Sequence, residues 1–296
     1  SRGAYTARSV GGLIGYAGLI GKRDLDRFDH LWTGYRLRDK VDHPDPRPDF
    51  KTRQAVRIKA IGVWDTVGSL GVPGNLDKVF TDFYKFHDTG LGLHIDNAFH
   101  ALALDERRKV FLPTLWHVDP KAKDDPKAKD QVLKQVWFAG VHCNVGGGYD
   151  EHGLSDITLA WMASEVDKLL AIDFDYLKLN RDLRTGWGLG MLYDSAKHWE
   201  LLKLVTRKPF TEPGITNEFI HSSVTIRLNG AAGATPAGYA SNALEGVDVN
   251  AKLCKLSPRE AELQWGAADV KPAVAQEPRQ FSIDKIKEKI LNLLGG

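Results

Sequence analysis

The chain has 296 residues, 43% of them hydrophobic, which suits one large folded domain or two small ones. Its formal net charge of +2 is the remainder of 40 basic and 38 acidic side chains, a balance that gives no case for a nucleic-acid partner. Two cysteines imply no disulfide framework and favour a reducing, cytoplasmic setting, and no apolar run is long enough to cross a membrane.

The chain begins with Ser1-Arg2-Gly3 and runs into an apolar stretch punctuated by glycines, which is compatible with a helix packed closely on a sheet. Ser-x-Gly opening a helix is the second half of a nucleophile elbow, Gly-x-Ser-x-Gly, in which the serine occupies a strained strand-to-helix turn. The first half of that motif would precede residue 1, so the chain reads as a fragment or a processed product. A serine beside a glycine also occurs in ordinary turns and helix N-caps, and this alternative stays open.

Three further elements are predicted before residue 110. The apolar spacing indicates an amphipathic helix over 24–32, and the apolar run 56–64 indicates a strand. That strand ends in Asp65 and a turn, which makes Asp65 a candidate site residue, with a cap or turn acid as the alternative. Residues 94–107 read as a helix, in which His100 is expected to pack or hydrogen-bond beneath the site rather than act as a base.

A tandem repeat of Asp-Pro-Lys-Ala-Lys-Asp occupies residues 119–124 and 125–130. A segment of this composition cannot bury an apolar core. We therefore expect residues 117–131 to form an exposed, mobile loop between two strands, without a chemical role.

The segment 136–149 carries the clearest indication of a site. Val136–Ala139 is a continuous apolar run, as in a strand buried on both faces. His142 and Asn144 follow at its carboxyl end, and Gly146–Gly148 then indicates a sharp turn or a close approach of the backbone. Ligands of open α/β sheets bind at the carboxyl ends of strands, so this turn is a candidate site. A buried strand followed by a glycine bend and a core histidine is the alternative.

The two apolar runs, 56–64 and 136–139, are predicted to be neighbouring parallel strands of one sheet. Each ends in a polar residue and a glycine-containing turn, and the segment 94–107 would be the crossover helix between them. Asp65 and Asn144 would then lie at the same edge of the sheet.

The second half of the chain offers fewer signals. A helix is predicted to begin near residue 154, and residues from about 173 to 212 are irregular and aromatic, which suits a cap over a site. His221 precedes two hydroxyl side chains and a short apolar segment, so it is a candidate site residue, with a surface-loop histidine as the alternative. An amphipathic helix over 283–294 has the spacing to dock onto a core or a partner.

The order of these motifs resembles that of one protein family. The motifs are Ser-Arg-Gly-Ala-Tyr-Thr-Ala-Arg from Ser1, Val-Trp-Asp-Thr-Val-Gly-Ser around Asp65, His-Ala-Leu-Ala-Leu-Asp-Glu-Arg from His100, and Val-His-Cys-Asn-Val-Gly-Gly-Gly-Tyr around Asn144. The family is the uncharacterised α/β-hydrolase domain family whose best understood members are type VI secretion phospholipase effectors. The resemblance is strong over residues 1–165 and weaker over 215–228.

The resemblance implies an α/β fold with a mostly parallel, α/β-hydrolase-like sheet, of which the N-terminal strands are missing from this chain. It implies a catalytic domain over 1–228, with a cap-like insertion at about 173–212, and a C-terminal extension over 229–296. The expected function is hydrolysis of a carboxylic ester or a phospholipid by a Ser-acid-His triad, with no metal or organic cofactor. Peripheral membrane contact would suit a lipid substrate, and a preceding segment or a partner chain would be needed to complete the sheet.

Carried over residue by residue, the family's serine falls on Ser1, its acid on Asn144 and its histidine on His221. An amide cannot carry the charge that stabilises a forming imidazolium, so Asp65 is the alternative acid. We expect His221 to lie beside Ser1 and Asp65, and His142 to support the glycine turn instead. Two other classes stay open: a hydrolase fold with a decayed triad, which Asn144 favours, and an N-terminal nucleophile hydrolase in which the free amine of Ser1 acts as the base.

Overall fold

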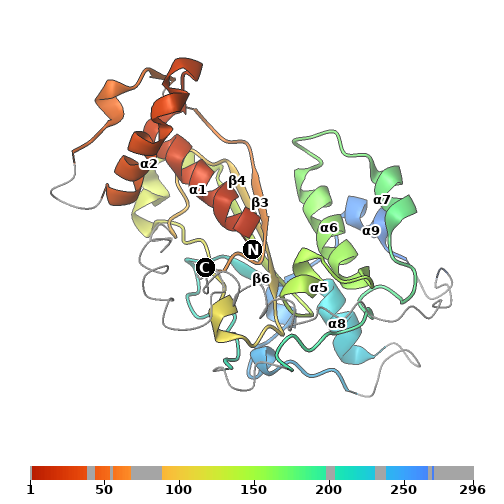
Figure 1. Ribbon diagram of the computed structural model, residues 1–296. Helices are drawn as coiled ribbons and strands as arrows, with labels where there is room; N and C mark the ends of the chain where they lie inside the picture. The colour runs from red at the N-terminus through yellow and green to blue at the C-terminus, as the bar shows by residue number, and fades with distance from the viewer. Residues whose placement is uncertain are drawn as a thin grey trace, which may run out of the picture.

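A five-stranded, all-parallel sheet forms the centre of the computed structural model, which describes residues 2–38, 44–53, 56–67, 89–197, 204–230, 238–265 and 269. The strands, in their order across the sheet, are β3 (Ile61–Trp64), β4 (Asn97–Ala103), β5 (Val132–Phe138), β6 (Glu218–His221) and β7 (Leu253–Cys254). Helices lie on both sides of this sheet (Figure 1). The predicted α/β class with a parallel sheet is therefore confirmed.

The helices differ widely in length. They are α1 (Arg2–Ala17), α2 (Phe28–Leu37), α4 (Pro126–Lys129), α5 (His142–Gly146), α6 (Gly153–Val166), α7 (Phe174–Asn180), α8 (Ser222–Asn229) and α9 (Pro258–Leu263). Short 3-10 segments are η1 (Lys22–Arg27), η2 (Arg47–Asp49), η3 (Lys109–Phe111), η4 (Pro120–Asp124), η5 (Asn242–Leu244) and η6 (Asn250–Lys252). Two short strands form a separate antiparallel pair: β1 (Leu19–Ile20), which follows α1, and β2 (Thr52–Arg53), which follows η2. Within the described ranges, none of the helices has the length and apolar character needed to span a bilayer.

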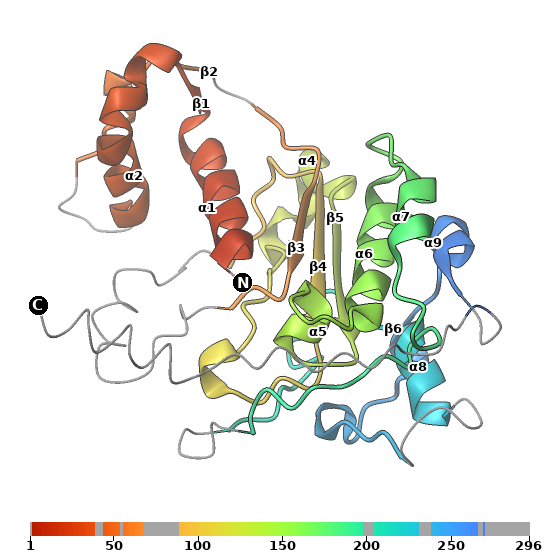
Figure 2. The same cartoon turned by 45° about the vertical axis from the view of Figure 1, so that its right-hand side comes forward.

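The two faces of the sheet are covered by different helices, as Figure 2 shows, with α1 on one side and α6 on the other. Ile61 of β3 faces α1, because a Cβ atom added to Gly11 would lie 2.6 Å from its Cδ1 atom. Gly62 faces α6, where an added Cβ would lie 2.6 Å from the Met162 sulfur. Alternate residues of β3 therefore point into two separate cores.

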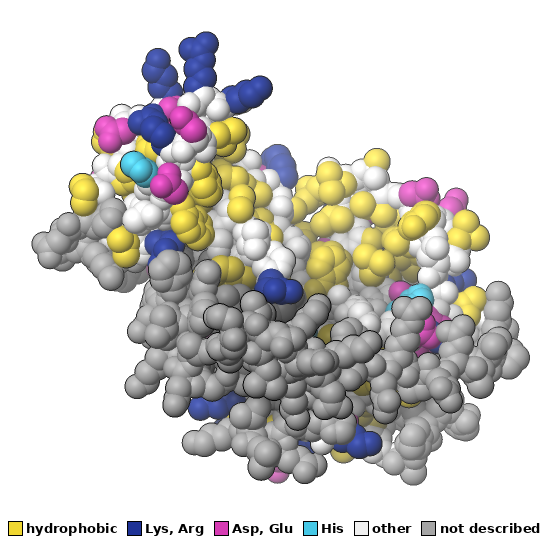
Figure 3. Space-filling model, in the orientation of Figure 1, with side chains coloured by type: hydrophobic (Ala, Val, Ile, Leu, Met, Phe, Trp, Pro, Cys, Tyr) yellow, Lys and Arg dark blue, Asp and Glu magenta, His cyan; other side chains and the backbone are white. Residues whose placement is uncertain are grey.

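The α6 side holds the larger aromatic core. Trp161 of α6 is buried against Phe99 of β4 and Phe138 of β5, at ring-centroid distances of 6.3 and 5.6 Å. Burial of each such side chain contributes roughly 2–3 kcal/mol. On the outer surface of α6 and α7, yellow side chains gather in Figure 3, and Leu170, Tyr176 and Leu179 belong to the large apolar residues exposed in this region.

Residues 97–103 form a strand, so the helix predicted over 94–107 is wrong. Asn97–Ala103 is β4, and every side chain from Ala98 to Ala103 is buried because β3 and β5 flank it and both faces of the sheet are covered. A short apolar run buried on all sides shows no period that distinguishes a strand from a helix. β4 also separates the two strands that were expected to be neighbours, although these run parallel and end at the same edge.

Other predicted elements are placed as follows. The helix expected over 24–32 is η1 followed by α2, and the helix expected near residue 154 is confirmed as α6. The repeat carries the short segments η4 and α4. The helix predicted over 283–294 lies outside the described residues. β7 pairs with β6 although it belongs to the expected C-terminal extension, and the domain boundary at residue 228 stays a prediction.

Candidate active site

Polar side chains collect at the carboxyl edge of the sheet. Asp65 follows β3, Glu106 follows β4 after two residues, and His142 is the first residue of α5, which follows β5. The start of α1 reaches the same edge, because this helix runs opposite to β3: its Gly11 faces Ile61, whereas Gly15 faces His94 before β4 begins. Figure 2 shows the first turn of α1 close to α5 at this edge.

Asp65 is fully buried and accepts four hydrogen bonds. Its Oδ1 atom accepts from the Ala103 backbone N–H at 3.0 Å and from Arg207 Nη1 at 2.6 Å. Its Oδ2 atom accepts from Arg207 Nη2 at 3.0 Å and lies 2.6 Å from His142 Nδ1. Burial by itself raises the pKa of the carboxyl, but the Arg207 charge and the His142 hydrogen bond outweigh it, so the pKa lies well below its usual range. Asp65 is therefore an ionised carboxylate.

The backbone of Asp65 has φ of 40°, in the left-handed region that a non-glycine residue adopts at a cost of order 1–3 kcal/mol. The side-chain bonds to Ala103, Arg207 and His142 hold the residue in this conformation. Strain of this kind at a strand end is typical of functional sites.

His142 is positioned as a general base would be. Its Nδ1 atom faces the Asp65 carboxylate, and the neutral imidazole that donates from Nδ1 carries its lone pair on Nε2. The side chain is 12% exposed, and the Phe111 ring meets it edge-on at a centroid distance of 5.0 Å. Its backbone N–H donates to Glu106 Oε2 at 3.3 Å. The carboxylate, the aromatic wall and the backbone bond together fix the direction of the imidazole.

His221 does not contact Asp65, so the placement expected for it is wrong. Its ring is fully buried, with Nε2 at 2.7 Å from Glu260 Oε1 and Nδ1 at 2.8 Å from Ser223 Oγ. The ring also stacks on Phe138 at 4.5 Å. β6 lies three strand positions from β3, and at about 4.8 Å per strand a histidine side chain cannot cross that distance. His221 joins β6 to α9.

Asn144 binds backbone groups. Its Oδ1 atom accepts from the N–H groups of Val141 and Tyr193 at 3.2 and 3.4 Å, and its Nδ2 atom donates to the Met191 carbonyl at 3.0 Å. The amide therefore ties the start of α5 to the segment around residue 192. Gly140, with φ of 115°, allows this packing, because an added Cβ would lie 2.4 Å from the Asn144 Cβ. These contacts direct Asn144 away from the triad-acid position expected for it.

His100 supports the site from below, as expected. It is fully buried, its Nε2 accepts from the Thr66 backbone N–H at 3.0 Å, and its Nδ1 lies 3.1 Å from Gln135 Oε1. Burial, followed by the charge of Arg8, lowers the pKa of His100 to about 3. The imidazole is therefore neutral and holds the turn that follows Asp65.

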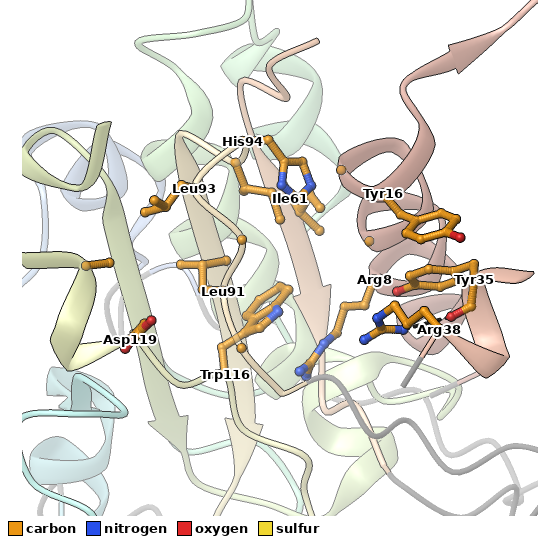
Figure 4. A pocket seen from close by; sticks show the side chains of 16 residues that line it. Arg8, Tyr16, Tyr35, Arg38, Ile61, Leu91, Leu93, His94, Trp116 and Asp119 are labelled. Carbon is orange, nitrogen blue, oxygen red and sulfur yellow. Dashed lines mark hydrogen bonds between the residues drawn. The ribbon is translucent and has the colours of Figure 1, made fainter. Parts of the chain in front are cut away.

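Two cavities lie near these residues. One, of about 390 Å³, has apolar walls from Ile61, Leu91 and Trp116, and Figure 4 shows Arg8 of α1 reaching from one side toward Trp116. The other, of about 300 Å³, is lined by Val141 and Arg207 together with residues around 193 and 240. Within the part of the chain that the structure describes, no group of three or more His, Cys, Asp or Glu side chains is arranged to hold a metal ion.

The remaining candidate, Ser1, lies outside the described residues. Sequence reasoning missed Arg207, Phe111 and Glu106 as parts of the site. Glu106 lies within the motif that starts at His100 and could have been noticed there, whereas Arg207 stands in an irregular segment without any local pattern.

Comparison with known proteins identifies one family. The model of the family described as T6SS, Phospholipase effector Tle1-like, catalytic domain matches residues 1–165, which is more than half of the 296 residues. No curated protein and no solved structure matches the chain. The matched range contains Asp65 and His142, whereas Arg207 and His221 lie beyond it.

Proposed function

Because this chain belongs to the family of Tle1-like type VI secretion phospholipase effector catalytic domains, we propose that it hydrolyses phospholipid carboxylic esters through a Ser1–His142–Asp65 triad. The observation that carries this proposal is the 2.6 Å contact between His142 Nδ1 and Asp65 Oδ2 at the carboxyl edge of the sheet. These two residues and Ser1 follow the chain order of α/β hydrolases, which is serine, acid, histidine.

Three features support Ser1 as the nucleophile. The Ser-Arg-Gly motif matches the second half of the nucleophile elbow. The helix that such an elbow requires is α1, and it begins at Arg2. The start of α1 lies at the edge where Asp65 and His142 meet. The Arg2 backbone N–H, next to the nucleophile, would be one oxyanion donor, helped by the positive end of the α1 dipole.

The proposed reaction has two halves. The Ser1 hydroxyl attacks the ester carbonyl while His142 Nε2 takes its proton, and the resulting imidazolium is stabilised by ionised Asp65. The tetrahedral intermediate collapses when His142 returns the proton to the leaving lysophospholipid oxygen, which leaves an acyl-serine. Water then attacks the acyl group, with His142 again as the base, and releases the fatty acid and free Ser1.

Asp65 suits the role of the acid better than Asn144 does. A buried carboxylate with a lowered pKa keeps its charge throughout the reaction and holds the imidazole in the required tautomer. Asn144 has a structural role instead, because its amide makes three hydrogen bonds to backbone groups. The amide at position 144 is therefore no longer an argument for a decayed triad.

Labelling of the full-length protein with a fluorophosphonate probe tests the proposal, with the modified residue mapped by mass spectrometry. We expect the label on Ser1 and hydrolysis of phospholipid vesicles by the unmodified protein. His142→Ala and Asp65→Asn should each lower kcat by about four orders of magnitude or more. His142→Ala should melt near the wild-type temperature, whereas Asp65→Asn should also lower stability, because it leaves the buried Arg207 charge without its carboxylate. A label on another residue, or a His142→Ala protein that retains turnover, would contradict the assignment.

A further inference from the structure

Arg207 is a buried cation that makes all its described hydrogen bonds at the proposed site. Its side chain is 1% exposed and donates to both carboxylate oxygens of Asp65. Nη1 donates to Oδ1 at 2.6 Å, and Nη2 donates to Oδ2 at 3.0 Å. Such a two-pronged pair fixes both the position and the rotation of a carboxylate. One Asp65 oxygen is thereby held for the Ala103 N–H and the other for His142.

The same guanidinium reaches two backbone carbonyls. Nη1 also donates to the Ala103 carbonyl at 2.6 Å, which connects the acid to the end of β4. Nη2 also donates to the Phe111 carbonyl, in the loop whose aromatic ring packs edge-on against His142. Arg207 therefore bonds both to Asp65 and to the Phe111 backbone, the two residues that hold the His142 imidazole. It has no described contact with the imidazole itself.

Arg207 also lies between the Asp65 carboxylate and a cavity. The cavity of about 300 Å³ is lined by Thr206 and Arg207, whereas Asp65 is fully buried and does not line it. Shortening the Arg207 side chain would connect this space with the Asp65 carboxylate. Water would then reach a carboxylate that the folded protein keeps dry.

We propose that Arg207 is a positioning residue of this hydrolase, which clamps Asp65 and the Phe111 loop in the geometry that His142 needs to act as the base. The inference rests on the proposed Ser1–His142–Asp65 triad. It places a determinant of activity in the segment 204–210, beyond the range matched by the family model. Without the clamp, the carboxylate at the strained Asp65 backbone keeps only its bonds to Ala103 and His142 and is less constrained in position. Displacement of a catalytic group by about 1 Å costs on the order of a hundredfold in rate.

Arg227 provides a matched control. It is also a buried arginine: as a whole residue it is 5% exposed, against 2% for the whole Arg207 residue. Its side chain donates to the carbonyls of Gly188 and Gly190 and has no described bond to the triad. Loss of either arginine should lower stability by leaving carbonyls without a donor. Only loss of Arg207 should act on the chemical step.

The experiment compares Arg207→Ala, Arg207→Lys and Arg227→Ala in the full-length protein, with His142→Ala as the reference for lost chemistry. The readouts are kcat and KM on a soluble p-nitrophenyl ester, the melting temperature, and the response of kcat to added guanidinium chloride far below denaturing concentrations. We expect Arg207→Ala to lower kcat about a hundredfold with KM nearly unchanged, and Arg227→Ala to change kcat less than about threefold at a temperature where it is folded. Guanidinium, entering through the cavity, should restore kcat at least about tenfold in Arg207→Ala only.

Arg207→Lys covers the case in which the alanine variant does not fold. It keeps the charge but cannot bond both carboxylate oxygens in the same way, so kcat should still fall about tenfold or more at a near-native melting temperature. A kcat for the lysine variant equal to wild type, or no guanidinium response in a folded alanine variant, overturns the clamp. Retained activity in His142→Ala would instead overturn the proposed triad, so the two failures are distinguishable.

Discussion

Replacing His221 with alanine should lower the stability of the fold and leave the hydrolytic activity of folded molecules intact. The imidazole is fully buried, bonded to Glu260 at 2.7 Å and to Ser223 at 2.8 Å, and stacked on Phe138. Alanine removes all three contacts. Glu260, itself 1% exposed, would remain buried without the partner that its Oε1 atom now has.

The size of the effect follows from these contacts. Removal of one partner from a buried pair typically costs about 3–5 kcal/mol, and the cavity left by the ring adds to it. At roughly 2–4 °C per kcal/mol for a domain of this size, the melting temperature should fall by about 10 °C. A second change, Glu260→Leu, removes the orphaned carboxyl, so the double variant should recover a large part of that loss.

Thermal melting by circular dichroism, together with ester hydrolysis measured well below the melting temperature, checks both halves of the prediction. The reference is His142→Ala, which should lose turnover with a much smaller change in melting temperature. A His221→Ala protein that melts like wild type yet fails to hydrolyse ester would refute the structural role and return His221 to the triad.

Three other changes have defined outcomes. Asn144→Asp should lower the free energy of unfolding, measured with urea, by about 1–3 kcal/mol without raising activity, because the carboxylate cannot donate to the Met191 carbonyl. Removal of the repeat 125–130 should shift the melting temperature little, because loop-closure entropy varies slowly with length, and a drop of many degrees would show that this segment packs. His100 has a folded pKa of about 3, below the ordinary 6.5, so below about pH 6.5 the unfolded state binds more protons and stability falls with decreasing pH until about pH 3. Urea titrations should show a slope of up to about 1.4 kcal/mol per pH unit from this group, and His100→Gln should lack that contribution.

The residues near the strand ends could be found from the sequence because their signal is local. Apolar runs that stop at Asp65 and before His142 are short patterns, and parallel strands place their carboxyl ends at one edge whatever their order. The same short patterns, in a fixed order, carried the resemblance to the family over residues 1–165.

The helix predicted over 94–107 failed for a related reason. Complete burial removes the alternation of apolar and polar side chains by which a strand is recognised. His100 is a polar residue within the run, but its ring is also fully buried, so it does not mark an exposed face. The expectation that the strands at 56–64 and 136–139 are neighbours failed through the same misassignment, because β4 lies between β3 and β5.

Sequence alone therefore determined the fold class, the family and the edge of the sheet where the polar residues gather. The tertiary structure decided which of them pair. Asp65 meets His142 and Arg207, which are 77 and 142 residues away, and His221 meets Glu260 at a separation of 39. The propensity to form a helix or a strand depends on neighbours in the chain. The partner of a buried polar or charged side chain depends instead on which groups the packed strands bring within hydrogen-bond distance.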